Sequence, residues 1–361
     1  MRLAVLCLLA SAVFPSLVCA QQQGAHANNP NESWTATTQT SVVNYNPSRT
    51  TESHAKSGNR SVDKLRVEQV GLNGSYQPEY ETEKETVQVN TATTRTVIRT
   101  YRWDVNGQRN LVQVTEEEAQ TSASGDAQVV RTTSSSDGNG NLQVMQREVA
   151  DTRKISPNAQ ETKTTFSFLD INGSLTPFMQ MQELQKRSDD QTVEMKKTTL
   201  MPDSSGSWEV DEVKESTIKE DGANQTSEGW ILRSDSEGRL SEFSRTVGKE
   251  TETAAGEKRN TVETYSTVIP GLAPDGNLHL NRRVTTVQKN DSVGKTSEQQ
   301  IEQPNPIDPN GRLQASTKTK YIVQYGASST QETRTIQVAD LNSNFNVVSV
   351  ETRKSDQVPA E

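Results

Sequence analysis

The tetrapeptides Asp104-Val105-Asn106-Gly107 and Asp170-Ile171-Asn172-Gly173 are two copies of a turn that returns along most of the chain. Counted at its last residue, this marker turn recurs at intervals of 32 to 38 residues, most often 33. Self-similarity at a fixed period indicates a row of equivalent supersecondary units. The last position is held by Gly74, Gly107, Gly140, Gly173, Gly206, Gly238, Gly276, Gly311 and Ser343.

The residue types of the marker turn predict a β-hairpin reversal. Asp at the first position accepts backbone hydrogen bonds, Asn tolerates the third position, and Gly supplies the positive φ that lets the strands pair again. The predicted structural turn residues are Asp104, Asn106, Gly107, Asp137, Asn139, Gly140, Asp170, Asn172, Gly173, Asp203, Gly206, Asp235, Gly238, Asp308, Asn310, Gly311, Asp340 and Asn342.

The segments between turns read as strands. A large apolar residue stands two places after the marker position in eight of nine copies, and apolar and polar residues often alternate from there. Such alternation is typical of a strand with one buried face. A second, looser set of breakers lies midway between markers, so each unit holds two turns and two strands of roughly 12 residues. Short connections favour antiparallel pairing of successive strands.

The expected fold is therefore all-β, with tandem hairpin repeats over residues 61–354 forming a long antiparallel meander of up to about 18 strands. An elongated twisted sheet, a propeller and a wide closed barrel all fit this pattern. Polar residues on both strand faces argue against an outer-membrane barrel. Aromatic residues make up only 5% of the chain, which argues against propeller blades. The elongated twisted sheet is favoured by elimination.

The ends of the chain differ from the repeat. Residues 1–20 read as a secretory signal peptide, with Arg2, a short apolar run and a small-residue cleavage site at Ala20. Residues 21–60 are predicted to be a flexible polar segment, and 355–361 a polar tail. Both cysteines, Cys7 and Cys19, lie in the leader, so the mature chain is expected to be cysteine-free. Export to a periplasmic or extracellular location follows from this reading.

Composition restricts the partners and the core. The net charge of -9 makes nucleic acid an unlikely partner. Hydrophobic residues are only 30% of the chain, so a thick single core is not expected. No segment after the leader is apolar enough to cross a membrane as a helix, and no membrane-spanning segment is predicted in the mature chain.

No catalytic, cofactor-binding or metal-binding residue is predicted. A calcium loop starting at Asp104 would need ligands where Gln108 and Thr115 stand, and a glycine where Arg109 stands. The three histidines after the leader have no metal-ligand spacing, and no carboxylate pair differs from the acidic background.

The sequence thus predicts an exported, acidic, non-enzymatic repeat protein with a structural, adhesive or ligand-binding role in a bacterial envelope or exterior. Its expected partner is an unknown protein or glycan of the cell envelope. The alternative is a secreted polysaccharide-active enzyme or carbohydrate-binding protein, with carboxylates or Trp residues on one sheet face.

Overall fold

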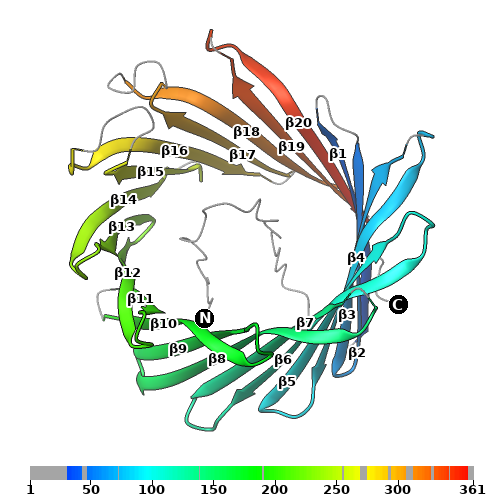
Figure 1. The fold of residues 1–361 in the computed structure, drawn as a ribbon. Coiled ribbons are helices and arrows are strands. Elements are labelled where there is room, and N and C mark those ends of the chain that lie inside the picture. Colours follow the sequence, from blue (N-terminus) through cyan, green and yellow to red (C-terminus); the bar gives the residue numbers. More distant parts are fainter. Residues whose placement is uncertain are drawn as a thin grey trace.

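A computed structural model describes residues 31–42, 47–71, 73–137, 139–188, 191–253, 256–268, 275–291, 294–305, 312–326, 329–340 and 342–356. Twenty strands run through these residues and form one sheet that curls into a barrel (Figure 1). The strands are β1 (Asn31–Val42), β2 (Ser48–Ser57), β3 (Arg60–Val70), β4 (Tyr76–Gln88), β5 (Thr93–Trp103), β6 (Arg109–Thr121), β7 (Ala127–Ser136), β8 (Leu142–Ser156), β9 (Ala159–Leu169), β10 (Leu175–Arg187), β11 (Thr192–Pro202), β12 (Trp208–Asp221), β13 (Asn224–Ser234), β14 (Leu240–Glu252), β15 (Lys258–Ser266), β16 (His279–Asn290), β17 (Gly294–Gln303), β18 (Gln314–Tyr325), β19 (Ser329–Ala339) and β20 (Phe345–Asp356).

Each strand pairs antiparallel with its neighbours in the chain, and β1 pairs antiparallel with β20, with Thr37 opposite Lys354. The all-β antiparallel meander is therefore confirmed. The favoured elongated open sheet is wrong, because the wide closed barrel forms instead. A twisted sheet of this width has two long edges of unpaired backbone groups, and closure satisfies both of them.

The first two strands correct the prediction for residues 21–60, since β1 and β2 lie where a flexible segment was expected. Apolar residues alternate with polar ones where one face of a strand packs against a core, and no thick core covers these two strands. They are held by backbone ladders on both sides, and their facing residues are often hydroxyl pairs such as Thr37 and Thr51. The predicted signal peptide and cleavage site lie outside the described residues and stay predictions.

The marker turns lie at one end of the barrel, here called the marker rim, which faces the viewer in Figure 1. In one copy Asp104 Oδ1 accepts hydrogen bonds from the backbone nitrogens of Asn106 and Gln108, each at 2.9 Å, and Gly107 has a φ of 77°. Equivalent Asp hydrogen bonds form at Asp137, Asp170, Asp203, Asp235 and Asp340. The predicted turn residues Asp308, Asn310 and Gly311 lie outside the described residues.

Acid is expected to loosen the marker rim. The backbone N–H of Gln108 lowers the pKa of Asp104, and the backbone N–H of Asn277 is the main cause that lowers the pKa of Asp275 to about 2. A lowered folded pKa gives stability that is complete above the unfolded value, 3.8, and is lost as the pH falls through the folded value. Carboxyl 13C titration of Asp-labelled protein should show these midpoints below 3.8, with Asp104→Asn as the control that removes one signal. Midpoints at or above 3.8 would contradict the turn geometry.

A ring of β-bulges lies just inside the marker rim. In each even-numbered strand from β4 to β20, one residue five places after the marker position has no partner on the preceding strand. Bulges increase the local twist and are common at barrel rims. They also offset the alternation of side chains between the two faces by one residue, so a strict two-residue period assigns the wrong faces beyond the bulge. The unpaired residues are Glu79, Val112, Met145, Phe178, Asp211, Phe243, Asn281, Ser316 and Val348.

The register assigns the paired residues to an inner and an outer face, because residues opposite each other share a face and successive residues alternate. Most of the buried side chains are small residues of the inner face, where a concave wall brings side chains together. Hydroxyl pairs cross the inner face, as between Thr152 and Thr162 at 2.9 Å. Buried inner residues include Ala36, Thr96, Thr115, Thr164, Ser244, Ser266, Thr330 and Ser349.

The outer face carries rows of exposed ion pairs. On β3 to β6 basic and acidic side chains alternate from strand to strand, so each charge lies beside one of opposite sign. Exposed pairs of this kind contribute about 0.2–1 kcal/mol each. The pairs are Arg60–Glu85 at 2.7 Å, Lys64–Glu83 at 3.2 Å, Arg99–Glu85 at 3.5 Å, Arg109–Glu83 at 3.0 Å and Arg95–Glu116 at 3.3 Å.

Candidate functional site

The inner wall of β9 and β10 carries an unusual group of aromatic side chains. The rings of Phe168 and Phe178 stack with their centroids 4.1 Å apart and their planes 14° apart. Phe166 lies against Phe178 at a tilt of 58° and a centroid distance of 6.3 Å. Phe168 ends this stack and is 47% exposed. With Met179 and Met181, these residues are called the Phe–Met cluster below.

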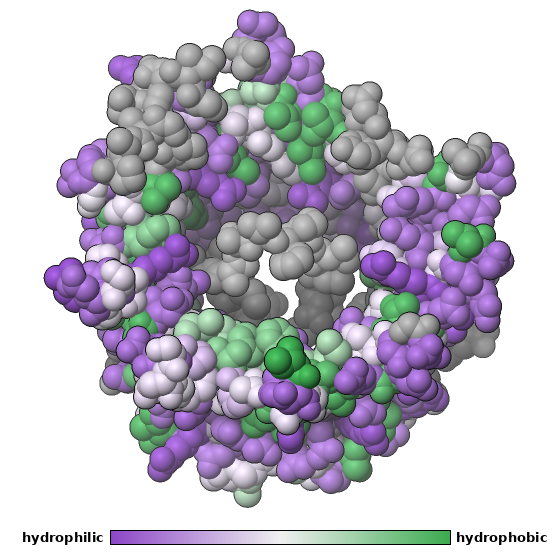
Figure 2. All heavy atoms as spheres, in the orientation of Figure 1, coloured by the Kyte–Doolittle hydropathy of each residue, from purple (hydrophilic) through white to green (hydrophobic). Residues whose placement is uncertain are grey.

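The strand register explains why these side chains meet. Met179 stands opposite Phe166, and the bulge skips Phe178 before pairing resumes at Pro177. The two residues of a bulge point to roughly the same side, so Phe178 joins the face of Phe166 and Phe168 instead of pointing outward. Figure 2 shows apolar residues on the interior side of the wall where the β9–β10 hairpin reaches the marker rim.

The repeat does not require this cluster. At the bulge position occupied by Phe178, the neighbouring copies have Met145 and Asp211. Every methionine after Met1 lies between residues 145 and 201, although the chain has only 6 in total. The concentration of Phe and Met on β8 to β11 therefore distinguishes these strands from the other repeats. Those methionines are Met145, Met179, Met181, Met195 and Met201.

Two groups of charged side chains lie on the inner face on either side of the cluster, and their net charges have opposite signs. On the β8 side, Arg131 lies between Glu117 at 2.6 Å and Glu148 at 2.8 Å, which leaves one negative charge in excess. Glu148 stands directly opposite Phe166.

On the β12 side, Glu212 lies between Lys214 at 2.8 Å and Arg233 at 3.1 Å, which leaves one positive charge in excess. The guanidinium of Arg233 also lies 3.9 Å from the ring centroid of Phe243. Glu212 stands opposite Thr199, which in turn stands opposite Met181, so this group lies two strands beyond the cluster.

A second charged group lies on the inner wall where the barrel closes. Arg353 of β20 reaches across β1 to Glu52 of β2 at 2.8 Å, and Glu332 lies 3.8 Å from the same guanidinium. The hydroxyl of Tyr321 donates to Glu332 at 2.8 Å. The small side chain of Ala36, opposite Glu52 and only 1% exposed, leaves room for this bridge. Figure 1 places these closing strands across the barrel from β9 and β10.

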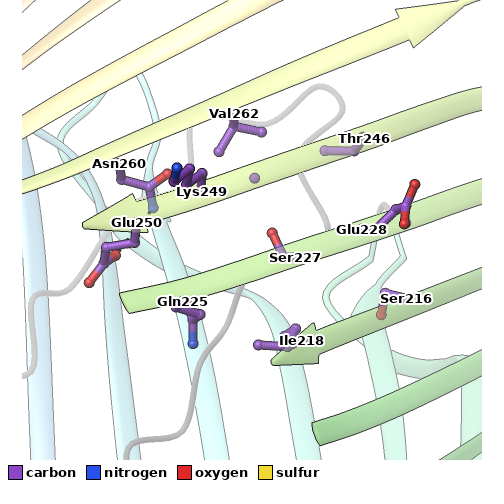
Figure 3. A pocket seen from close by; sticks show the side chains of 12 residues that line it. Ser216, Ile218, Gln225, Ser227, Glu228, Thr246, Lys249, Glu250, Asn260 and Val262 are labelled. Carbon is purple, nitrogen blue, oxygen red and sulfur yellow. Dashed lines mark hydrogen bonds between the residues drawn. The ribbon is translucent and has the colours of Figure 1, made fainter. Parts of the chain in front are cut away.

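A shallow hollow in the inner wall of β12 to β15 is too small for a solute. Gly229 and Gly248 are among its lining residues, and Figure 3 shows Ser227, Thr246 and Val262, which line it as well. A Cβ added at Gly248 would clash with Ser227 Oγ. The volume of about 50 Å³ has room for a few water molecules only.

The turn residues predicted from the sequence do not gather in the lumen; those described are distributed around the marker rim. His279, the first residue of β16, lies 2.9 Å from Asp275, and His54 pairs with Asp63 at 2.5 Å. Within the described residues, no group of three or more His, Cys, Asp or Glu side chains has a metal-binding arrangement. Sequence reasoning missed the Phe–Met cluster, and the local excess of Met and Phe between residues 166 and 201 was the signal available.

Comparison with known proteins finds likeness in fold alone. No family model matches the chain, and no curated protein matches its sequence. The siderophore receptor PirA of Pseudomonas aeruginosa is 8% identical over 92% of this chain and 81% of its own, with a TM-score of 0.49. The outer membrane protein OpdK of the same organism is 9% identical over 91% and 98%, with a TM-score of 0.37. A BenF-like porin of Pseudomonas fluorescens is 9% identical over 91% and 98%, with a TM-score of 0.40.

Closure of the sheet corrects the function predicted from the sequence. A structural, adhesive or ligand-binding role in a bacterial envelope or exterior, with a protein or glycan partner, rested on an extended β surface, and the strands form a closed barrel instead. The alternative of a polysaccharide-active or carbohydrate-binding protein used one face of the same open sheet and falls with it.

The prediction that no segment of the mature chain spans a membrane is also corrected. That prediction rested on the absence of an apolar helix and on polar strand faces, which were taken to argue against a barrel. No helix in the described part of the chain is long and apolar enough to cross a membrane. Closed sheets are the other architecture that satisfies every backbone group inside a bilayer, and β1–β20 pairing closes this sheet.

Proposed function

We propose that this protein is an exported outer-membrane β-barrel that forms a wide aqueous passage for solutes. The observation that carries the proposal is the pairing of β1 with β20, which closes twenty strands around a lumen. Barrels of 16–18 strands leave an aqueous channel, so a twenty-strand wall gives room for one. The charged groups of the inner wall, such as Arg353 and Glu332, suit a lumen filled with water.

The charged side chains of the outer wall determine what insertion into a bilayer costs. A Lys or Arg on the lipid face of a barrel costs about 2–4 kcal/mol at the bilayer midplane and about 0–1 kcal/mol near the interfaces. On β3 to β6 such residues lie beside acids, as Lys64 lies 3.2 Å from Glu83, so the charges occur as pairs. The location of the folded barrel is therefore the first quantity to measure.

The experiment has two parts. The full chain is expressed with its own leader in a bacterial host, and the envelope is separated into outer membrane, inner membrane and periplasm. We expect the protein in the outer-membrane fraction, with faster migration in unheated than in heated gel samples because a closed barrel resists detergent. Purified barrel added to a planar lipid bilayer should then give discrete conductance steps that increase with salt concentration.

The matched control is the same protein unfolded and added without refolding, which should give no steps. Recovery of folded protein only from the periplasm, or insertion without conductance, would overturn the proposal. A folded state is established separately by the strand signal in circular dichroism, so failure to fold is distinguished from failure to insert.

A further inference from the structure

We propose that the Phe–Met cluster is a contact site for planar aromatic solutes on the inner wall. This inference rests on the proposed function, because it names the class of solute that the passage favours. Four features of the wall carry this inference: the ring stack, the exposure of Phe168, the thioethers beside it and the carboxylate of Glu148.

The ring stack has an open end. Phe168 stacks face to face on Phe178 with centroids 4.1 Å apart, and it remains 47% exposed on a wall where most residues are polar. Aromatic rings prefer offset-stacked or edge-to-face contacts, with centroids about 4.5–7 Å apart. A planar ring entering the lumen can therefore extend the stack at Phe168.

Thioether side chains border the stack. Met179 stands opposite Phe166, and Met181 stands two residues further along the same strand and face. Met145, which is 41% exposed, is the bulge residue next to Gln146, and Gln146 stands opposite Phe168. Methionine is flexible and polarizable, and its sulfur makes favourable contacts with ring edges, so these side chains can adapt to rings of different outline.

The neighbouring carboxylate favours a ring over a plain alkyl chain. Glu148 stands opposite Phe166, so its carboxylate borders the apolar surface on the β8 side. An aromatic ring has a positive edge that a carboxylate attracts, whereas a saturated chain has no such edge. The cluster is thus matched to planar aromatic molecules by both its shape and its electrostatics.

Methionine methyl NMR tests this proposal without requiring transport. The five methionines of the mature chain give five 13C-methyl signals, and all of them lie on β8, β10 or β11. Indole, a neutral planar probe, is titrated into refolded barrel in detergent. We expect saturable ring-current shifts at Met179 and Met181. The shifts at Met195, which lies on β11 outside the cluster, should be smaller. Cyclohexanol, similar in size but not aromatic, should give no such shifts.

The variant Phe168→Leu keeps an apolar side chain but removes the ring, and it should weaken indole binding by about two- to tenfold. Phe345→Leu, a ring removed on β20, is the matched control and should bind indole as the native protein does. Equal shifts with cyclohexanol, shifts that do not saturate, or normal binding by Phe168→Leu would overturn the proposal. Binding without conductance would instead sink the proposed passage and leave the site intact, and conductance without binding would do the reverse.

Discussion

Deletion of residues 31–47, which removes β1 and the residues between it and β2, is expected to abolish the closed barrel and the conductance that depends on it. The deletion takes away the ten paired positions between β1 and β2 and the eight between β1 and β20. It also leaves the wall with an odd number of strands. β20 and β2 run in the same direction, because each is antiparallel to β1, and they cannot close the sheet as an antiparallel pair.

Deletion of residues 31–57 is the matched control, because it removes β1 and β2 together. The wall then has an even number of strands, and β20 meets β3 in the antiparallel sense. We expect this larger deletion to close again as a narrower barrel with a smaller unit conductance, whereas the smaller deletion exposes strand edges and aggregates. Folding is checked by heat-modified gel migration and circular dichroism. If the 31–47 deletion folds and conducts as well as the 31–57 deletion, the closure described here is wrong.

The sequence identified the local structure of this barrel well and its closure poorly. The Asp and Gly of the marker turns act through contacts within five residues, so the pattern around Asp104 and Gly107 was enough to predict a row of antiparallel hairpins. Closure depends on the two ends of the chain. β1 and β2 carry Thr, Ser and charged residues with no apolar alternation, so nothing local indicated that they complete the wall.

The candidate site could not be predicted for a related reason. Met179 stands opposite Phe166, so uninterrupted alternation from Met179 would put Phe178 on the opposite face, and the bulge breaks that alternation. The bulge is set by pairing with β9, a contact between strands that residue spacing does not reveal. The local excess of Met and Phe was visible in the sequence, but without the register it did not say which face these residues share.

The ion pair between Arg353 and Glu52 is expected to contribute to stability far more than the pairs of the outer wall. It joins β20 to β2 across β1 at 2.8 Å, and the two side chains are only 23% and 15% exposed. Hydrogen bonds to charged groups in such places contribute about 1.5–3 kcal/mol, and partial exposure lowers this, so a double-mutant cycle of Arg353→Gln and Glu52→Gln should give a coupling of about 1–2 kcal/mol. Chemical denaturation measures each free energy of unfolding.

The single variants should differ in a way that only this arrangement explains. Glu52→Gln leaves Arg353 near Glu332 at 3.8 Å, while Arg353→Gln removes the base that faces both acids, so the second change should destabilise more. The outer pair Arg95–Glu116, at 3.3 Å with side chains 57% and 56% exposed, is the matched control and should give a coupling of about 0.2–0.5 kcal/mol. Equal coupling for the two pairs would mean that the contact across β1 adds nothing to closure, and the barrel would then be held at its seam by backbone pairing alone.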